Sequence, residues 1–268
     1  MFNINKYFRT IKILLLLVKN FTNWNDILKR VLRGYGIYSL SSRSGIKIRG
    51  SKNDNLLRLW NEIFIDNSYR ISNMSIKETD IILDIGANIG LFSINVSQYT
   101  KNKIFALEPH PENFTQLKDN VKLNGIKNVA CINLGLQGEN DGSRYFLNNS
   151  NHAGFIMENA LTEKNIGSVR TSEKLSLACI TFQELCNTHA INKVNLLKLD
   201  CEGAEGEIIK SLSKHDMDII EKFVIEFHDN VSILDHDEII TILIDNNFGC
   251  ELKWDGQSNF GYIYAQKI

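Results

Sequence analysis

The chain has 268 residues, 43% of them hydrophobic and 23% charged, which is enough apolar material for one large soluble domain. Thirty basic and 31 acidic residues leave a formal charge of −1, so no global field attracts nucleic acid. The five cysteines are odd in number and form no CxxC pair, which argues against a disulfide framework or a zinc site. We therefore expect a cytoplasmic globular protein in a reducing compartment, with no nucleic-acid partner.

Residues 1–45 are predicted to form a basic, helical N-terminal extension to a domain that spans residues 46–268. An apolar run from Ile13 to Val18 follows three basic residues. The run is far shorter than the roughly 20 residues of a transmembrane helix, and no convincing signal-peptide cleavage site follows it. Two alternatives stay open: a helix that packs on the domain or on a partner subunit in a homo-oligomer, and an amphipathic helix in peripheral contact with a membrane.

After residue 45 the pattern predicts an α/β domain. The segment 46–49 alternates like a short strand, and Asp54 is expected to cap the helix that follows. Further along the chain, strands alternate with helices, which is typical of a parallel sheet with helices on both faces. Gly125 is expected to end one of these helices, and a capping box at Thr181 to start another. Strands are expected at 81–83, 104–107, 129–134, 194–199 and 222–227, followed by an antiparallel hairpin of 250–254 and 260–265.

The segment 135–176 breaks this rhythm. It is rich in Asn, Gly and Ser, and only residues 144–147 resemble a strand. Long irregular loops in compact domains are usually functional or disordered. Because the segment follows the carboxyl end of a strand, we predict a substrate-facing loop.

The stretch from Asp80 to Glu108 has the layout of a nucleoside-binding unit: an apolar strand, a glycine turn, a helix and a second strand that ends on an acid. The small residues of the turn are expected to let the backbone approach a ligand closely. A dinucleotide fingerprint needs a glycine where Asn88 stands, so the turn is a poor cradle for pyrophosphate. A ligand with a ribose and a charged amino-acid tail, such as S-adenosylmethionine, fits better.

S-adenosylmethionine is therefore the predicted cofactor, and each of its parts has an expected neighbour. Asp84 would meet the ammonium group, directly or through water, and Glu108 would accept the ribose hydroxyls. The adenine would lie beside the residues that follow the third strand. The predicted cofactor-binding residues are Asp84, Gly86, Ala87, Asn88, Gly90, Glu108, Leu136 and Asp200.

Four runs of the sequence resemble the FkbM-type family of S-adenosylmethionine-dependent methyltransferases over about residues 76–229: LDIGANIGLFS, ALEPHPENFTQLKDNVKLNG, NLLKLDCEGAEGEIIKSL and VIEFHD. The segment from Lys198 to Glu205 is the most characteristic of the family. The resemblance implies a class I methyltransferase (Rossmann-like) fold, with a seven-stranded sheet whose last strand is antiparallel. It also implies O-methylation of a hydroxyl, on a sugar or surface-glycan precursor or on a secondary metabolite.

The candidate catalytic residues follow two neighbouring strands: Asp200 and Glu202 after one, Glu226 and His228 at the end of the next. The carboxyl ends of parallel strands share one rim, so these groups are expected to converge near the cofactor turn. Asp200 or His228 would accept the hydroxyl proton, with Glu202 and Glu226 positioning the acceptor and Lys198 as a further candidate. Our first hypothesis is catalysis without a metal; a divalent cation held by Asp200, Glu202 and Glu226 is the alternative.

Three other functions compete with this hypothesis. A non-catalytic scaffold protein would keep the fold and lose the activity, yet the cofactor and rim motifs are intact. A methyltransferase of nucleic acid is disfavoured because the chain lacks an NPPY-like motif and a basic surface. An NAD-dependent dehydrogenase is disfavoured by Asn88 and by the terminal hairpin.

Overall fold

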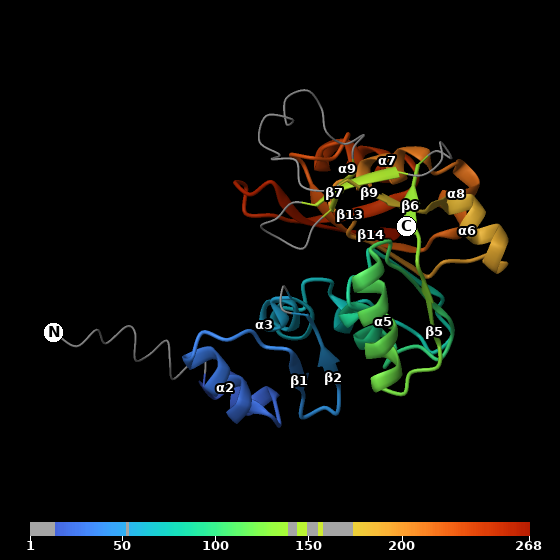
Figure 1. The fold of residues 1–268 in the computed structure, drawn as a ribbon. Helices are drawn as coiled ribbons and strands as arrows, with labels where there is room; N and C mark the ends of the chain where they lie inside the picture. The colour runs from blue at the N-terminus through green and yellow to red at the C-terminus, as the bar shows by residue number, and fades with distance from the viewer. Residues whose placement is uncertain (1–13, 52–53, 139–143, 149–154, 158–173) are drawn as a thin grey trace.

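The computed structural model describes residues 14–51, 54–138, 144–148, 155–157 and 174–268 (Figure 1). Its centre is a seven-stranded sheet in the order β13-β14-β12-β11-β3-β4-β5. The strands from β12 to β5 run parallel, whereas β14 runs antiparallel to both neighbours. This order confirms the class I methyltransferase fold and its antiparallel terminal hairpin. The strands span Ile82–Ile85 (β3), Ile104–Leu107 (β4), Val129–Ile132 (β5), Leu196–Leu199 (β11), Lys222–His228 (β12), Phe248–Lys253 (β13) and Phe260–Lys267 (β14).

Helices cover both faces of the sheet, and a separate core cluster lies under each face. Helices α6 to α9 pack on one face, and α4, α5 and the N-terminal elements pack on the other. In Figure 1 the first group is seen in the upper half of the view, with α7, α8 and α9 labelled, and the second in the lower half, with α2, α3 and α5 labelled. Both predicted helix boundaries are confirmed: Gly125 follows the end of α5 with φ +66°, and Thr181 caps the start of α6 with a capping box. The helices span Leu91–Val96 (α4), Pro111–Leu123 (α5), Phe182–His189 (α6), Glu205–Ser211 (α7), Lys214–Ile219 (α8) and His236–Asp245 (α9).

An N-terminal layer, residues 14–73, closes the face that carries α4 and α5. It begins with a helix over residues 14–20 and continues with α2 (Trp24–Leu32), β1 (Ser39–Ser41), β2 (Lys47–Arg49), α3 (Leu56–Trp60) and two short helical turns, Asn61–Ile65 and Ile71–Asn73. Its apolar side chains share one core cluster with α4 and α5. The segment expected to be helical therefore also contains β1, and the position after residue 45 lies between the paired strands β1 and β2.

The predicted helix cap in this layer was one residue off. Asn55, not Asp54, is the N-cap of α3, and its side chain accepts a hydrogen bond from the backbone N–H of Arg58 at 3.3 Å. The Asp54 carboxylate instead accepts a hydrogen bond from the backbone N–H of Ser51. Asp54 is thus used to close the turn after β2, which leaves the cap to its neighbour.

Two smaller sheets lie in the middle of the chain. Strand β6 (Gly135–Gln137) pairs in parallel with β10 (Cys179–Thr181), and β7 (Arg144–Asn148) lies between β8 (Phe155–Met157) and β9 (Lys174–Leu177). The strand-like stretch at 144–147 is confirmed by β7, whereas most of the predicted substrate-facing loop lies outside the described residues. Among the helices that the structure describes, none combines the length and the apolar character needed to cross a membrane.

Candidate active site

Alternation along four strands turns a set of polar side chains toward the N-terminal layer. Lys198 on β11 is in register with Asp84 on β3, and Glu226 on β12 is in register with Tyr262 on β14. Each of these residues lies two positions from a residue of the core cluster under that layer. Because side chains two residues apart in a strand share a face, all four point to the same side of the sheet.

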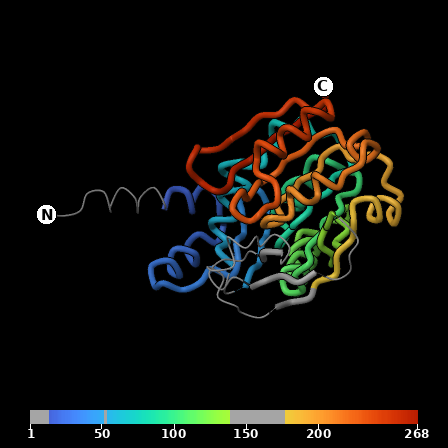
Figure 2. The backbone as a smooth tube through the Cα atoms, turned by 90° about the horizontal axis from the view of Figure 1, so that it is seen from above, coloured from blue at the N-terminus to red at the C-terminus, as the bar shows by residue number. Residues whose placement is uncertain are grey.

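The C-terminal hairpin and the N-terminal layer meet above this face (Figure 2). The Tyr262 hydroxyl donates a hydrogen bond to Glu62 at 3.1 Å, and the Tyr264 hydroxyl donates one to the backbone carbonyl of Ser68 at 2.5 Å. These bonds fix the N-terminal layer over the carboxyl ends of the central strands. Residues far apart in the sequence thereby enclose one site.

A cavity of about 70 Å³ lies between the glycine turn, the strand ends and the N-terminal layer. The turn contributes Gly86 to Ile89, and the strand ends contribute Lys198, Asp200, Glu202 and Glu226. The N-terminal layer and α4 complete the lining with Arg58, Leu59, Glu62, Ile63, Tyr69, Leu91 and Phe92. Four carboxyl groups thus face two cationic side chains, a balance that favours a cationic ligand.

The two glycines of the turn are required by packing within the protein. Gly86 has φ +75°, and a Cβ atom there would lie 1.8 Å from the backbone oxygen of Asp200. Gly90 has φ +94°, and a Cβ atom there would lie 2.6 Å from a methyl group of Leu117 on α5. The expectation that both glycines serve the approach of a ligand is therefore incomplete: Gly86 lets the turn contact the end of β11, and Gly90 lets it contact α5.

Glu108, at the end of β4, is bonded to the turn. Its carboxylate accepts hydrogen bonds from the backbone N–H groups of Asn88 at 2.8 Å and His110 at 2.9 Å. Burial nevertheless raises the pKa of Glu108 to about 7. Each carboxylate oxygen has a further lone pair, so the two hydroxyls of a ribose fit as additional donors. Those donors would stabilise the ionised form, which the cofactor-free site disfavours.

Asp84 and Lys198 form a buried ion pair beneath the cavity, with Nζ 3.2 Å from Asp84 Oδ1. Ser93 donates to Asp84 Oδ2 at 2.6 Å, and the Lys198 ammonium donates to the carbonyl of Gly86 at 2.7 Å. Burial lowers the pKa of Lys198, but Asp84 and Asp200 more than offset this effect, so the net shift is upward. Asp84 is fully buried and does not line the cavity, whereas Lys198 does. Lys198 therefore links the glycine turn, through the carbonyl of Gly86, to the rim of strand-end residues, through Asp200 Oδ2 at 3.4 Å.

Tyr69 joins the two carboxylates at the centre of the rim. Its hydroxyl lies 2.8 Å from Asp200 Oδ2 and 2.9 Å from Glu226 Oε2. A phenol has one proton to donate, so both contacts are favourable only when the carboxylates share a further proton or cation. Burial, followed by the charges of Asp200 and Glu62, raises the pKa of Glu226. The raised pKa favours a protonated Glu226, so a shared proton, or a cation in its place, balances the charge between the two carboxylates.

His228 lies between two glutamates on the outer side of the rim. Its Nδ1 lies 3.3 Å from Glu205 Oε1, and its Nε2 lies 3.7 Å from Glu202 Oε2. Burial lowers the pKa of His228, but the Glu205 carboxylate raises it more strongly, to about 10. Glu205 is itself fixed, because it accepts hydrogen bonds from the backbone N–H groups of Cys201 and Gly203. The imidazole is therefore held in one orientation and carries a proton at neutral pH.

The structure brings most of the predicted residues to one place. Asp200, Glu202, Glu226 and Lys198 line the cavity together with Gly86, Ala87 and Asn88. Five predicted residues do not line this cavity: Asp84, Gly90, Glu108, Leu136 and His228. Of these, Leu136 lies away from the site, because its side chain belongs to the core cluster under α6 to α9. Four residues at the site were not predicted from the sequence: Arg58, Glu62, Tyr69 and Tyr262. Arg58 on α3 and Glu62 on the helical turn that follows it stand four residues apart, opposite the apolar positions, which is a pattern visible in the sequence. No such pattern points to Tyr69.

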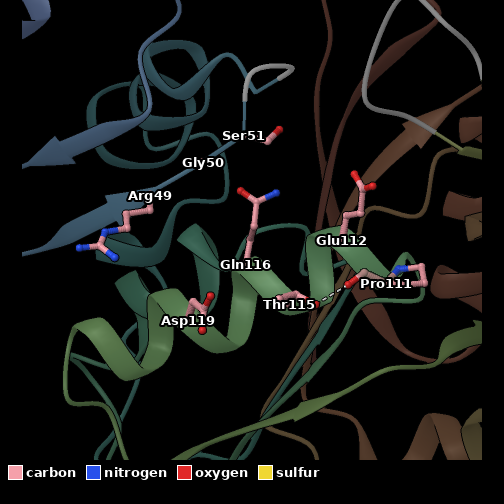
Figure 3. A pocket seen from close by; sticks show the side chains of 8 residues that line it. All are labelled: Arg49, Gly50, Ser51, Pro111, Glu112, Thr115, Gln116 and Asp119. Carbon is pink, nitrogen blue, oxygen red and sulfur yellow. Dashed lines mark hydrogen bonds between the residues drawn. The ribbon is translucent and has the colours of Figure 1, made fainter.

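A second cavity, of about 550 Å³, lies between β2 and the outer side of α5 (Figure 3). The side chains around it are Arg49, Ser51, Glu112, Thr115, Gln116 and Asp119, together with Gly50 and Pro111. It is larger and more open, yet it contains none of the strand-end residues and no buried cluster of ionisable groups. We therefore place the chemistry in the smaller cavity, where the groups converge.

Residues 84–263 match the family model described as the methyltransferase FkbM domain. The chain is 29% identical to methyltransferase sdnD of Sordaria araneosa, over 63% of this chain and 73% of that protein. It is 26% identical to the hexuronic acid methyltransferase AglP of Haloferax volcanii, over 62% of this chain and 63% of that protein. It is 21% identical to the 31-O-demethyl-FK506 methyltransferase FkbM of Streptomyces tacrolimicus, over 71% and 80% respectively. The chain therefore belongs to the FkbM methyltransferase family, whose class of reaction is S-adenosylmethionine-dependent methyl transfer.

Proposed function

We propose that the protein transfers the methyl group of S-adenosylmethionine to a hydroxyl of a sugar or surface-glycan precursor. The observation that carries the proposal is the position of one small acidic cavity between the glycine turn and the carboxylate rim. A volume of about 70 Å³ is well below the roughly 300 Å³ of a site that encloses a whole small molecule. The cavity therefore suits the reacting groups, a sulfonium methyl and one hydroxyl, with the nucleoside extending past Glu108.

The chemistry requires alignment and the removal of one proton. A lone pair of the acceptor oxygen forms the bond to the methyl carbon, and the carbon–sulfur bond breaks with its electron pair on sulfur. The hydroxyl proton passes to a carboxylate of the rim, for which Asp200 is the candidate, because the raised pKa of Glu226 favours its protonated form. His228 carries a proton at neutral pH, so we assign it to positioning and not to proton removal. The surplus of carboxyl groups also suits a positively charged sulfonium.

The choice of acceptor rests on the donor and acceptor groups of the rim. The carboxylates of Glu62, Asp200 and Glu226 and the hydroxyl of Tyr69 accept hydrogen bonds from hydroxyls, as a polyol acceptor requires. The relative AglP is named a hexuronic acid methyltransferase, which supports a carbohydrate acceptor. The relative FkbM is named a 31-O-demethyl-FK506 methyltransferase, and a secondary metabolite, the other acceptor expected from the sequence, is the competing acceptor.

Calorimetric titration with S-adenosylmethionine and with NAD tests the cofactor. We expect binding of S-adenosylmethionine only, and at least tenfold weaker binding by Glu108→Ala, because the ribose contacts would be lost. Release of S-adenosylhomocysteine is then measured with uronic-acid glycans and with macrolides as acceptors. Binding without turnover on any hydroxyl acceptor would favour the scaffold alternative, and binding of NAD would refute the assignment.

A further inference from the structure

Three side chains of the rim converge in the manner of metal ligands. Asp200 follows β11, and Glu226 and His228 lie at the end of the adjacent strand β12. One ligand atom from each of the three lies within 4.8 Å of the other two. A cation at the point equidistant from the three atoms would therefore lie within about 2.8 Å of each of them. If each side chain moved toward that point by about half an ångström, the distances would become those of bonds to a divalent cation.

We propose that Asp200, Glu226 and His228 bind a divalent cation, which deepens the methyltransferase function proposed above and rests on it. The set differs from the alternative metal site named from the sequence, Asp200, Glu202 and Glu226, because His228 takes the place of Glu202. The Glu202 side chain is 48% exposed, whereas the side chains of Asp200 and His228 are 22% and 13% exposed. A half-exposed carboxylate on the solvent side is poorly placed to serve as a fixed ligand.

The surroundings of His228 support a ligand role through an independent contact. The fully buried Glu205, which is outside the ligand set, lies 3.3 Å from Nδ1 and is fixed by two backbone N–H groups. Metal-binding histidines are commonly oriented by a carboxylate on the nitrogen that does not bind the metal. Such a contact leaves Nε2 as the nitrogen available to a cation. Glu205 is thus expected to act as a positioning residue.

The hydroxyl of Tyr69 marks the point on which the two carboxylates converge. It contacts both Asp200 and Glu226, although its single proton satisfies only one of them. The Lys198 ammonium lies 3.4 Å from Asp200 Oδ2, but it also pairs with the buried Asp84 and donates to the carbonyl of Gly86, so it neutralises Asp200 only in part. A bound cation would neutralise the remaining charge between the carboxylates.

The donor set indicates the class of cation. Two carboxylates and one imidazole suit a first-row divalent ion such as Mn²⁺ better than Ca²⁺, which prefers oxygen ligands alone. With three protein ligands, positions remain for the acceptor. A hydroxyl bound there would lose its proton more readily, and neighbouring hydroxyls of a sugar would chelate. The cation would thus select a polyol acceptor and activate it.

The test is a titration of the full chain, stripped with EDTA and desalted, with Mn²⁺ alone, followed by the EPR signal of free Mn²⁺. We expect one site, and at least tenfold weaker binding in Glu226→Gln and in His228→Ala. Glu78→Gln, a matched change of an exposed surface glutamate, should bind as the unchanged protein does. Glu202→Gln should weaken Mn²⁺ binding less than His228→Ala does, since Glu202 is outside the ligand set and only a charge 3.7 Å from His228 Nε2 is lost.

The outcomes separate this inference from the proposed function. Thermal unfolding identifies variants that fail to fold, and Asp200→Asn, nearly isosteric, replaces His228→Ala in that case. Failure to bind Mn²⁺ below millimolar concentration, with S-adenosylmethionine binding and turnover intact in EDTA, would overturn the cation site and leave the methyltransferase function standing. Loss of affinity in Glu202→Gln but not in His228→Ala would overturn this ligand set. Absence of S-adenosylmethionine binding would instead refute the proposed function.

Discussion

Replacement of Gly86 by alanine tests how the cofactor turn is attached to the rim. The new Cβ atom would lie 1.8 Å from the backbone oxygen of Asp200, a separation that non-bonded atoms do not reach. The obstacle is backbone, so no side-chain rotation relieves it. The turn and the end of β11 must therefore separate by about 1 Å or more. That separation moves both the residues expected to contact the cofactor and the rim that is expected to receive the acceptor.

The magnitude follows from two contributions. A non-glycine residue with left-handed φ costs about 1–2 kcal/mol, and overpacking of a tight contact costs a further 1–3 kcal/mol or so. Gly125 provides the matched control, because it has φ +66° and nothing lies within 4 Å of its hypothetical Cβ. Gly125→Ala therefore carries only the backbone cost. The expected difference between the two variants is about 2 kcal/mol in the free energy of unfolding.

The assay combines thermal unfolding with calorimetric titration of S-adenosylhomocysteine. A difference of about 2 kcal/mol corresponds to a midpoint roughly 4–8 °C lower for Gly86→Ala than for Gly125→Ala. Affinity for S-adenosylhomocysteine should fall at least tenfold in Gly86→Ala and stay within about twofold in Gly125→Ala. Equal midpoints and equal affinities in the two variants would show that the contact between Gly86 and Asp200 does not control the turn.

Three further predictions concern the cofactor and the rim. Affinity for S-adenosylhomocysteine should increase by up to tenfold for each unit by which the pH is raised toward about 7, and should then level off. The reason is that burial raises the pKa of Glu108 to about 7, and the ribose hydroxyls favour its ionised form. The same titration with Glu108→Gln should give a flat profile, and a slope that persists in this variant would assign the effect to another group. Tyr69→Phe keeps the ring contact with Phe92 but removes the hydroxyl from the carboxylates, so kcat should fall roughly tenfold with cofactor affinity nearly unchanged. Parallel losses of kcat and affinity would contradict a role at the rim. Lys198→Met leaves the buried Asp84 without its cation and should lower the free energy of unfolding by about 3–5 kcal/mol in urea denaturation. Unchanged stability would mean that Asp84 is not held as a buried anion.

The fold was predictable because its signals are local and strong. Short apolar strands separated by helices specify a parallel sheet, and Asp255 with Gly256 marks the loop of the final hairpin. The cap of α3 was misplaced because Asp54 and Asn55 are both good caps, and only the turn after β2 decides between them. A pattern of residue types does not contain that tertiary contact.

The site was predictable only where it follows strand ends. Asp200 and Glu226 were identified from that rule, and the cavity contains both. Tyr69 belongs to the N-terminal layer, and more than 100 residues of sequence separate it from Asp200, which it contacts. No rule based on sequence spacing therefore predicts this contact. Leu136 follows the third strand, as predicted, but its side chain points into the core and not toward the cofactor. Successive side chains of a strand point to opposite faces, so an error of one residue in the sequence interpretation places a side chain on the wrong side.

The geometry also bears on which rim residue accepts the hydroxyl proton. Without a cation, the carboxylates around His228 keep its imidazole protonated, so it has no free lone pair at neutral pH. With a cation bound as we propose, the Nε2 lone pair of His228 would bind the metal, and Nδ1 would still face Glu205. In either state the imidazole is occupied. The Asp200 carboxylate, by contrast, has two oxygens, so it can hold Tyr69 or a cation with one and accept the proton with the other, whereas the raised pKa of Glu226 favours its protonated form. The role of base therefore falls to Asp200, and His228 sets the charge and the geometry in which Asp200 acts.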